Sequence, residues 1–138
     1  MLRYCDKCQK KIETKTATKD KTFNVRGENI TVTTQVLVCQ RCGEELFSEE
    51  LDDAALVNAY NEYRKRHNLL FPDEIKQIRE RYDFNQPDFA NFLSWEEETI
   101  CKYENGVLPS EEHNRLLVFL RKPENMRIWL SESARKYF

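Results

Sequence analysis

Four of the five cysteines fall into two pairs, and these pairs are the residues best suited to chemistry. Cys5 and Cys8 form the first pair, and Cys39 and Cys42 form the second after a gap of 30 residues. Each Cys-x-x-Cys turn can direct two sulfurs at one ion, and Zn²⁺ prefers four tetrahedral ligands of this kind. Gly43, directly after Cys42, suits a turn that needs a permissive backbone. The spacing therefore predicts one structural zinc ion per chain, held by four thiolates.

Two other interpretations of these cysteines are open. They could be redox-active dithiols, or they could be buried as small apolar side chains. The neighbouring Asp6, Lys7, Gln40 and Arg41 are polar, which argues against core packing, and a redox site needs only one such pair. A zinc ion with four thiolates has no open position for water, so we expect no catalytic role for the metal. Cys101 has no partner in the sequence, and we expect it to pack within a helix.

The residues between the two cysteine pairs favour β-structure. Residues 11–18 are rich in Thr and Lys and predict a short, solvent-facing strand. β-branched residues dominate residues 30–38. A glycine-containing turn at residues 26–29 separates this run from residues 23–25, which predicts a β-hairpin. Such a hairpin leaves the first cysteine pair and returns to the second, so it accounts for the long gap between them.

From Ser48 the apolar period changes from that of a strand to that of a helix. One helical stripe is formed by apolar residues at three- and four-residue intervals: Leu51, Ala55, Leu56, Ala59, Tyr60 and Tyr63. Acidic residues lie at the start of this segment and basic residues at its end, as the helix dipole favours. We interpret it as a surface helix that ends at residues 68–71. We expect an exposed linker there, with one domain over residues 1–70 and another over 71–138.

Residues 72–138 predict an all-α domain of five helices. Asn85 can cap the second of them, and Asn105-Gly106 can end the third. We expect the helices at residues 72–82, from residue 86 onward, and at 97–104, 111–120 and 124–136. The fold class is therefore α+β, with a small zinc-bound β-rich domain followed by a five-helix domain.

Charge and composition narrow the function. The net charge is −2: residues 1–70 hold 12 Lys+Arg against 11 Asp+Glu, and residues 71–138 hold 10 against 13. Neither half is basic, so charge alone gives no signature of nucleic-acid binding. No apolar run approaches the roughly 20 residues of a membrane span, and the N-terminus has no signal-like stretch, so we expect a cytoplasmic protein. His67 and His113 stand alone beside charged residues, and we expect no enzymatic activity.

Residues 84–106 carry a more specific pattern. Residues 84–86 read Phe-Asn-Gln, and residues 99–106 read Thr-Ile-Cys-Lys-Tyr-Glu-Asn-Gly. Between them, a core between two short helices is indicated by the spacing of Phe89, Leu93, Trp95 and Ile100. Ala90 is small, where these two helices would cross closely. The pattern resembles the helix-turn-helix of the phage-repressor (Cro/C1, XRE) family. With the two cysteine pairs upstream, the chain is similar, to about residue 125, to the MqsA antitoxin family, also called YgiT-type zinc finger proteins.

The resemblance implies an antitoxin that is also a transcriptional regulator and autorepressor. The zinc domain of such a protein would bind a partner toxin, and the XRE-type helical domain would bind palindromic operator DNA as a homodimer. The implied DNA-contacting residues are Gln86 at the start of the second helix, then Glu97, Glu98, Thr99 and Lys102 on the recognition helix. Tyr103 could be a core residue or a contact.

The departures from the family pattern leave other functions open. Glu98 stands where the family has a base-reading Asn, and Lys102 replaces an Arg, so the operator sequence does not carry over. Glu96 and Glu97 add two more acids at the start of the recognition helix. Carboxylates repel phosphate, although a Glu can accept a hydrogen bond from cytosine N4. The main alternative is therefore a protein-interaction module without DNA binding, and a dithiol oxidoreductase is a third possibility.

Overall fold

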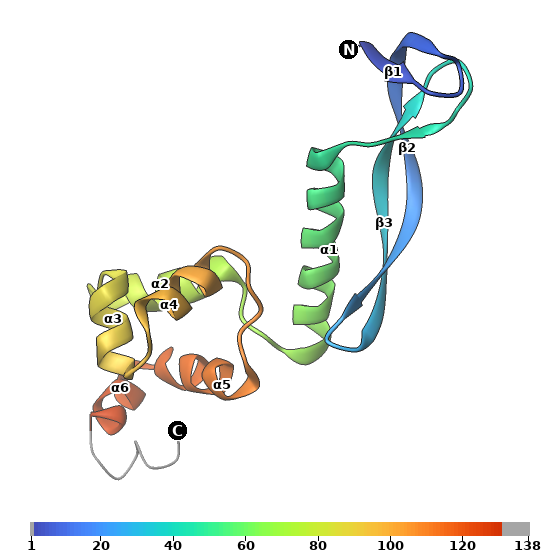
Figure 1. Ribbon diagram of the computed structural model, residues 1–138. Coiled ribbons are helices and arrows are strands. Elements are labelled where there is room, and N and C mark those ends of the chain that lie inside the picture. The colour runs from blue at the N-terminus through green and yellow to red at the C-terminus, as the bar shows by residue number, and fades with distance from the viewer. Residues whose placement is uncertain (1, 131–138) are drawn as a thin grey trace. The chain divides into compact units, whose positions relative to one another are not determined.

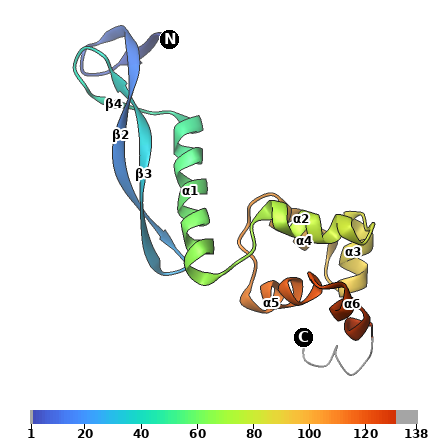
Figure 2. The same cartoon turned by 180° about the vertical axis from the view of Figure 1, so that it is seen from behind.

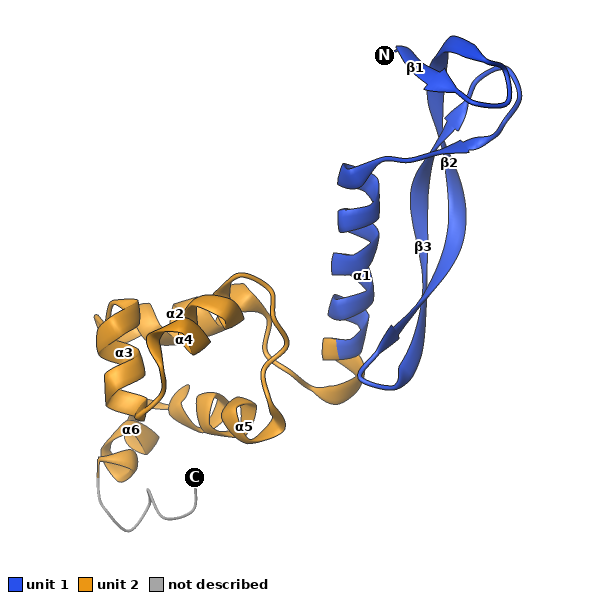
Figure 3. Cartoon of the chain, in the orientation of Figure 1, with its two compact units in different colours: residues 1–63 blue, residues 64–138 orange. Residues whose placement is uncertain are grey.

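The computed structural model describes residues 2–130, which divide after Tyr63 into two compact units (Figure 3). The first unit contains all the described strands, and the second is helical. The α+β class is therefore confirmed. The expected domains, residues 1–70 and 71–138, stay a prediction; by its contacts, the segment from Arg64 onward belongs to the second unit.

The first unit is built on an antiparallel sheet with the strand order β1-β2-β3-β4. Its strands are β1 (Leu2–Cys5), β2 (Lys10–Val25), β3 (Glu28–Cys39) and β4 (Glu45–Leu46). β2 and β3 form one long hairpin in which Thr14 pairs with Cys39 and Val25 pairs with Glu28. The hairpin thus connects the two cysteine pairs as predicted. The sequence did not indicate β1 and β4, because strands of four and two residues are too short to show a period.

The hairpin is longer, and its turn tighter, than the sequence predicted. The two strands expected before the turn are one continuous strand, and only Arg26 and Gly27 lie between β2 and β3. Both have positive φ, 50° and 86°, which lets a two-residue turn follow the twist of the strands. The side chain of Asn24 accepts a hydrogen bond from the Gly27 N–H (3.1 Å). The predicted four-residue turn is therefore wrong.

Helix α1 (Glu49–His67) lies alongside the hairpin in both views of the chain (Figures 1 and 2). Its buried apolar residues repeat every four positions: Ala55, Ala59 and Tyr63. The ammonium of Lys21 on β2 lies 3.2 Å from a carboxylate oxygen of Asp52. Leu56 was expected in the buried stripe but is exposed. It lies beside the row formed by Ala55, Ala59 and Tyr63 rather than on it.

Up to residue 130, the second unit contains five short helices after the end of α1. They are α2 (Pro72–Arg81), α3 (Gln86–Leu93), α4 (Glu97–Glu104), α5 (Glu111–Leu120) and α6 (Pro123–Trp129). Asn85 caps α3 as predicted, with its side chain accepting from the Asp88 N–H (2.8 Å). The last helix ends at Trp129, and the remainder of its expected range beyond residue 130 lies outside the described residues.

One apolar core fills the second unit. Phe89, Ala90 and Leu93 of α3 and Ile100 of α4 are buried in it, together with residues of α2, α5 and α6. Ala90 is 1% exposed, and a side chain of this size lets α3 and α4 approach closely. The predicted core between two short helices is confirmed at Phe89, Leu93 and Ile100, and Trp95 packs against it while only half-buried.

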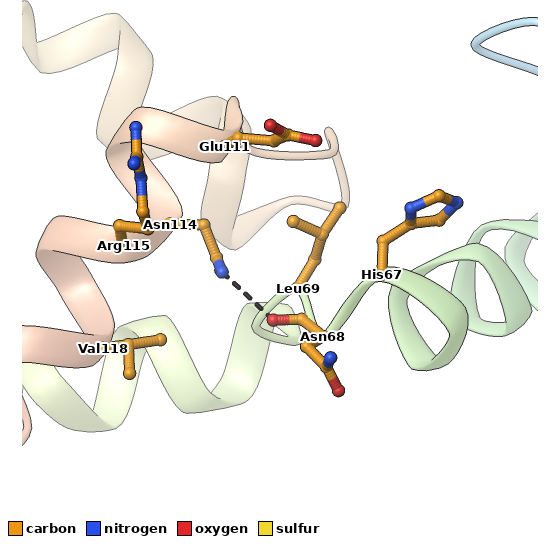
Figure 4. Close-up of a pocket in the computed structure, with 7 residues that line it drawn as sticks. All are labelled: His67, Asn68, Leu69, Glu111, Asn114, Arg115 and Val118. Carbon is orange, nitrogen blue, oxygen red and sulfur yellow. Dashed lines mark hydrogen bonds between the residues drawn. The ribbon is translucent and has the colours of Figure 1, made fainter.

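The expected exposed linker is instead anchored to this core. Leu69 and Leu70 are buried. The side-chain amide of Asn114 on α5 accepts from the Leu70 N–H (2.8 Å) and donates to the Asn68 carbonyl (3.1 Å), as Figure 4 shows for the second bond. Because both the apolar side chains and the backbone of this segment are held, the prediction that it is exposed is wrong.

Candidate metal centre and helix-turn-helix

The two Cys-x-x-Cys turns fold in the same way. The N–H of Gln9 donates to the Cys5 carbonyl (2.7 Å), and the N–H of Gly43 donates to the Cys39 carbonyl (2.9 Å). Gln9 and Gly43 both have left-handed backbones, with φ of 58° and 76°. The sequence indicated this conformation at Gly43 but gave no sign of it at Gln9, since Gln adopts it rarely.

The four paired cysteines meet at one point. All four sulfurs lie within 4.8 Å of one another. Cys5 Sγ is 3.5 Å from Cys42 Sγ, and Cys8 Sγ is 3.9 Å from Cys39 Sγ. Four sulfurs bound at about 2.3 Å around a tetrahedral zinc ion would lie about 3.8 Å apart. The structure therefore brings together all four predicted ligands at a spacing that fits a metal ion.

The surroundings of these thiols also fit a cation. Cys5 and Cys39 are fully buried, and Cys8 and Cys42 are half-buried. Burial, with hydrogen bonds among the thiols, raises the pKa of Cys8 to about 12. Burial also acts to raise the pKa of Cys39, but the backbone N–H groups of Cys42 and Arg41 outweigh it and lower that pKa to about 6. Four crowded sulfurs cannot all ionise unless a positive ion lies among them.

Cys101 lies apart from this cluster, on α4 in the second unit. It is half-buried and accepts hydrogen bonds from the Asn105 side-chain amide at its sulfur (3.3 Å) and its carbonyl (2.8 Å). It therefore faces the end of its own helix and does not belong to the buried core.

Helices α3 and α4 are two short helices joined by a turn, in the place where the sequence predicts a helix-turn-helix. Ser94, the C-cap residue directly after α3, has a left-handed backbone with φ of 60°. The turn that follows leads into α4 at Glu97. Of the residues expected to contact DNA, Gln86 and Thr99 are half-buried, and the remaining three are exposed: Glu97, Glu98 and Lys102. Their contact with DNA stays a prediction. Tyr103 is 8% exposed and belongs to the core.

Lys102 is paired within its own helix. Its ammonium lies 3.0 Å from a carboxylate oxygen of Glu98, one turn earlier, and both side chains are more than half exposed. Exposed pairs of this kind contribute at most about 1 kcal/mol. Glu98 therefore offsets the charge of the one lysine on α4, but it holds this lysine only weakly.

A largely shielded ion pair that the sequence did not reveal fixes α4 against α2. Arg79 donates two hydrogen bonds to the Glu104 carboxylate (2.9 and 2.8 Å) and a third to the Phe84 carbonyl (2.9 Å). The two side chains are only 12% and 6% exposed. Hydrogen bonding to Glu104 raises the pKa of Arg79. A residue pair separated by 25 positions gives no local pattern, so it could be found only in the fold.

His113 is another contact that the sequence analysis missed. Its Nδ1 lies 2.7 Å from the Tyr103 hydroxyl, and its ring stacks on Trp95 with centroids 3.9 Å apart. Burial lowers the pKa of His113, so the neutral ring can accept the Tyr103 O–H. The expectation that His113 stands alone is therefore wrong: it joins α5 to α4 and to the turn before α4.

A pocket of about 440 Å³ opens between residues 67–69 and one face of α5 (Figure 4). Its lining residues are His67, Asn68, Leu69, Glu111, Asn114, Arg115 and Val118. The amide of Asn114 is already used by two backbone hydrogen bonds. The other polar side chains are mixed in charge, which favours no single class of ligand.

The chain matches a family model over residues 3–127. That family is described as the antitoxin component of bacterial toxin-antitoxin systems, MqsA. Because the match covers most of the chain, this protein belongs to the MqsA antitoxin family, as the sequence pattern implied. A search of curated proteins finds none that matches. No helix among residues 2–130 is long and apolar enough to cross a membrane.

The cysteine cluster can be tested by a matched pair of substitutions. We expect the protein and its Cys101→Ser variant to contain about one metal ion per chain, and Cys39→Ser to contain little, because a thiolate ligand is lost. We also expect Cys39→Ser to lose hydrogen-exchange protection in β1–β4 while α2–α6 keep theirs, since the helical unit has its own core. Equal metal content in all three proteins, measured by elemental analysis, would contradict the assignment.

Proposed function

We propose that this member of the MqsA antitoxin family is a zinc-dependent antitoxin and autorepressor. Its first unit binds a partner toxin, and its second unit binds operator DNA as a homodimer. The observation that carries the proposal is the family match over residues 3–127. The clustered cysteines and the exposed face of α4 support it.

Zinc is the ion that the cysteine cluster suits best. Thiolates are soft ligands that select zinc, copper(I) or iron-sulfur clusters over magnesium or calcium. Four sulfurs within 4.8 Å of one another leave room for a single ion. They complete a tetrahedral shell, so the role of the ion is structural.

DNA binding is supported by how α4 is held and by what it exposes. The Arg79–Glu104 pair and the packing of Tyr103 fix the inner side of α4. Glu97, Glu98 and Lys102 are left exposed. A dimer of such units would read two half-sites about one helical turn apart. We propose that Lys102 donates to a base or a phosphate and that Gln86 contacts the backbone.

The acidic start of α4 favours a second candidate, a protein-interaction module without DNA binding. Glu96, Glu97 and Glu98 are all exposed, and the one lysine of α4 is paired with Glu98. If the unit does bind DNA, few phosphates are neutralised, and we expect the affinity to fall only shallowly as salt rises. The following experiment separates the two candidates.

Lys102→Ala should weaken binding to the promoter of the protein's own gene by about 1–3 kcal/mol if Lys102 reads a guanine, and should relax the preference at that base pair. If Lys102 contacts only phosphate, the loss should be the same for all sequences. Binding is measured by fluorescence anisotropy over a series of salt concentrations. A folded, dimeric protein that binds no promoter fragment at low salt would leave the interaction module as the function.

Glu98→Gln and Glu97→Gln serve as paired variants in the same assay. Glu98 pairs with Lys102, whereas Glu97 makes no ion pair within residues 2–130. If Glu98 only offsets the lysine charge, Glu98→Gln should strengthen binding to all DNA more than Glu97→Gln does. If either acid accepts from cytosine N4, its replacement should weaken binding to the operator alone.

Toxin binding by the first unit is supported by the family and by the unpaired edges of its hairpin. β1 pairs with β2 only over Lys10–Glu13, and β4 pairs with β3 only at Leu37 and Val38. Much of each long strand therefore has an edge without a neighbouring strand among the described residues, and such edges can accept a strand from a partner.

Co-expression with the product of the adjacent gene tests the antitoxin role. We expect the intact chain to restore growth that the partner alone arrests. Cys39→Ser should fail to restore it, because the first unit loses its metal. Lys102→Ala should restore growth fully, since it changes only the second unit. Equal rescue by Cys39→Ser, or no rescue by the intact chain, would exclude toxin neutralisation by a metal-bound first unit.

A further inference from the structure

We propose that Arg64, which lies outside the helix-turn-helix, is a positioning residue for the recognition helix α4. The inference concerns the DNA-binding role proposed above and adds a residue on which that role depends. Arg64 lies in the last turn of α1 and is only 2% exposed. Its guanidinium Nη2 donates to the carbonyl of Gly106, over 2.7 Å.

Gly106 is where the chain leaves α4. Its φ is 111°, and the N–H of Val107 turns back to the Lys102 carbonyl (3.0 Å). Gly106 lies two residues beyond Glu104, the last residue of α4, and the helix dipole is negative at that end. The buried guanidinium of Arg64 therefore places a positive charge near this end of α4 and donates to the backbone that leaves it.

The position of Arg64 is itself fixed. Its guanidinium lies 5.8 Å from the centre of the Phe71 ring, directly before α2. The N–H of Leu69 donates to the Arg64 carbonyl (2.9 Å), and the Asn114 amide holds the backbone of Asn68 and Leu70 (Figure 4). Arg64 thus contacts the end of α4 from a segment that is tied to α5.

Two arginines therefore hold the C-terminal end of α4. Arg79 binds Glu104 from α2, and the buried Arg64 binds Gly106 from α1. The exposed residues proposed to meet DNA lie on the same two-turn helix. A rotation of its C-terminal end would displace Lys102, so operator affinity depends on Arg64 although Arg64 itself is buried.

The test compares three variants of the full chain. Arg64→Met removes the donor and the charge, Arg64→Lys keeps the charge and one donor, and Lys65→Met removes an exposed charge from the neighbouring position of α1. Hydrogen exchange is measured at the amides of residues 105–107, and affinity is measured with the promoter DNA. Charge-assisted hydrogen bonds are worth a factor of about ten or more in an equilibrium constant.

We expect Arg64→Met to raise exchange at residues 105–107 and to weaken promoter binding, each by about tenfold relative to Lys65→Met. The amides of α5 and of β2–β3 should exchange as in the unmodified chain, and Arg64→Lys should recover most of both losses. Exchange at 105–107 that is unchanged, or that rises equally throughout α2–α6, would overturn the proposal. The exchange readout does not need DNA, so a failure of the unmodified chain to bind its promoter counts against the proposed function alone.

Discussion

The meeting of four thiols within 4.8 Å is the constraint on which the first unit depends. Among the described residues, the cluster of buried side chains around these thiols is small: it adds Ile12 to Cys5 and Cys39, and Leu46 packs against it. A small sheet buries too little apolar area to overcome the entropy of ordering its chain. A metal ion that binds only the folded arrangement adds its binding free energy to folding. The two Cys-x-x-Cys turns, which fold in the same way, then fix where the long hairpin begins and ends.

The second unit rests on different interactions. Its helices share one apolar core, and buried polar contacts set the position of α4 within that core. Three contacts reach this helix from its neighbours. Arg79 of α2 binds Glu104, and His113 of α5 binds Tyr103. Arg64 of α1 binds Gly106, which follows the C-cap of α4. Buried polar groups are costly unless they are paired, so these contacts favour one orientation of the helix. The acids exposed on its outer side take no part in this core.

Local patterns predicted much of this fold. The Cys-x-x-Cys spacing predicted the cysteine cluster, the apolar period predicted α2–α5 closely, and Asn85 marked the start of α3. Two of the errors arose where distant residues decide the outcome. Leu69 and Leu70 looked like a linker because only the distant Asn114 shows that their segment is anchored. Arg64 looked like one of several solvated basic residues because its partner is 42 positions away. The hairpin turn was predicted too long because Glu28 is able to pair with Val25 across just two residues.

X-ray absorption at the metal edge of the purified protein tests the central claim most directly, because it reports the atoms bound to the ion without requiring a variant. The cluster of Cys5, Cys8, Cys39 and Cys42 predicts a zinc edge with a single shell of four sulfurs at about 2.3 Å. A shell containing nitrogen or oxygen ligands, or fewer than four sulfurs, would contradict the account.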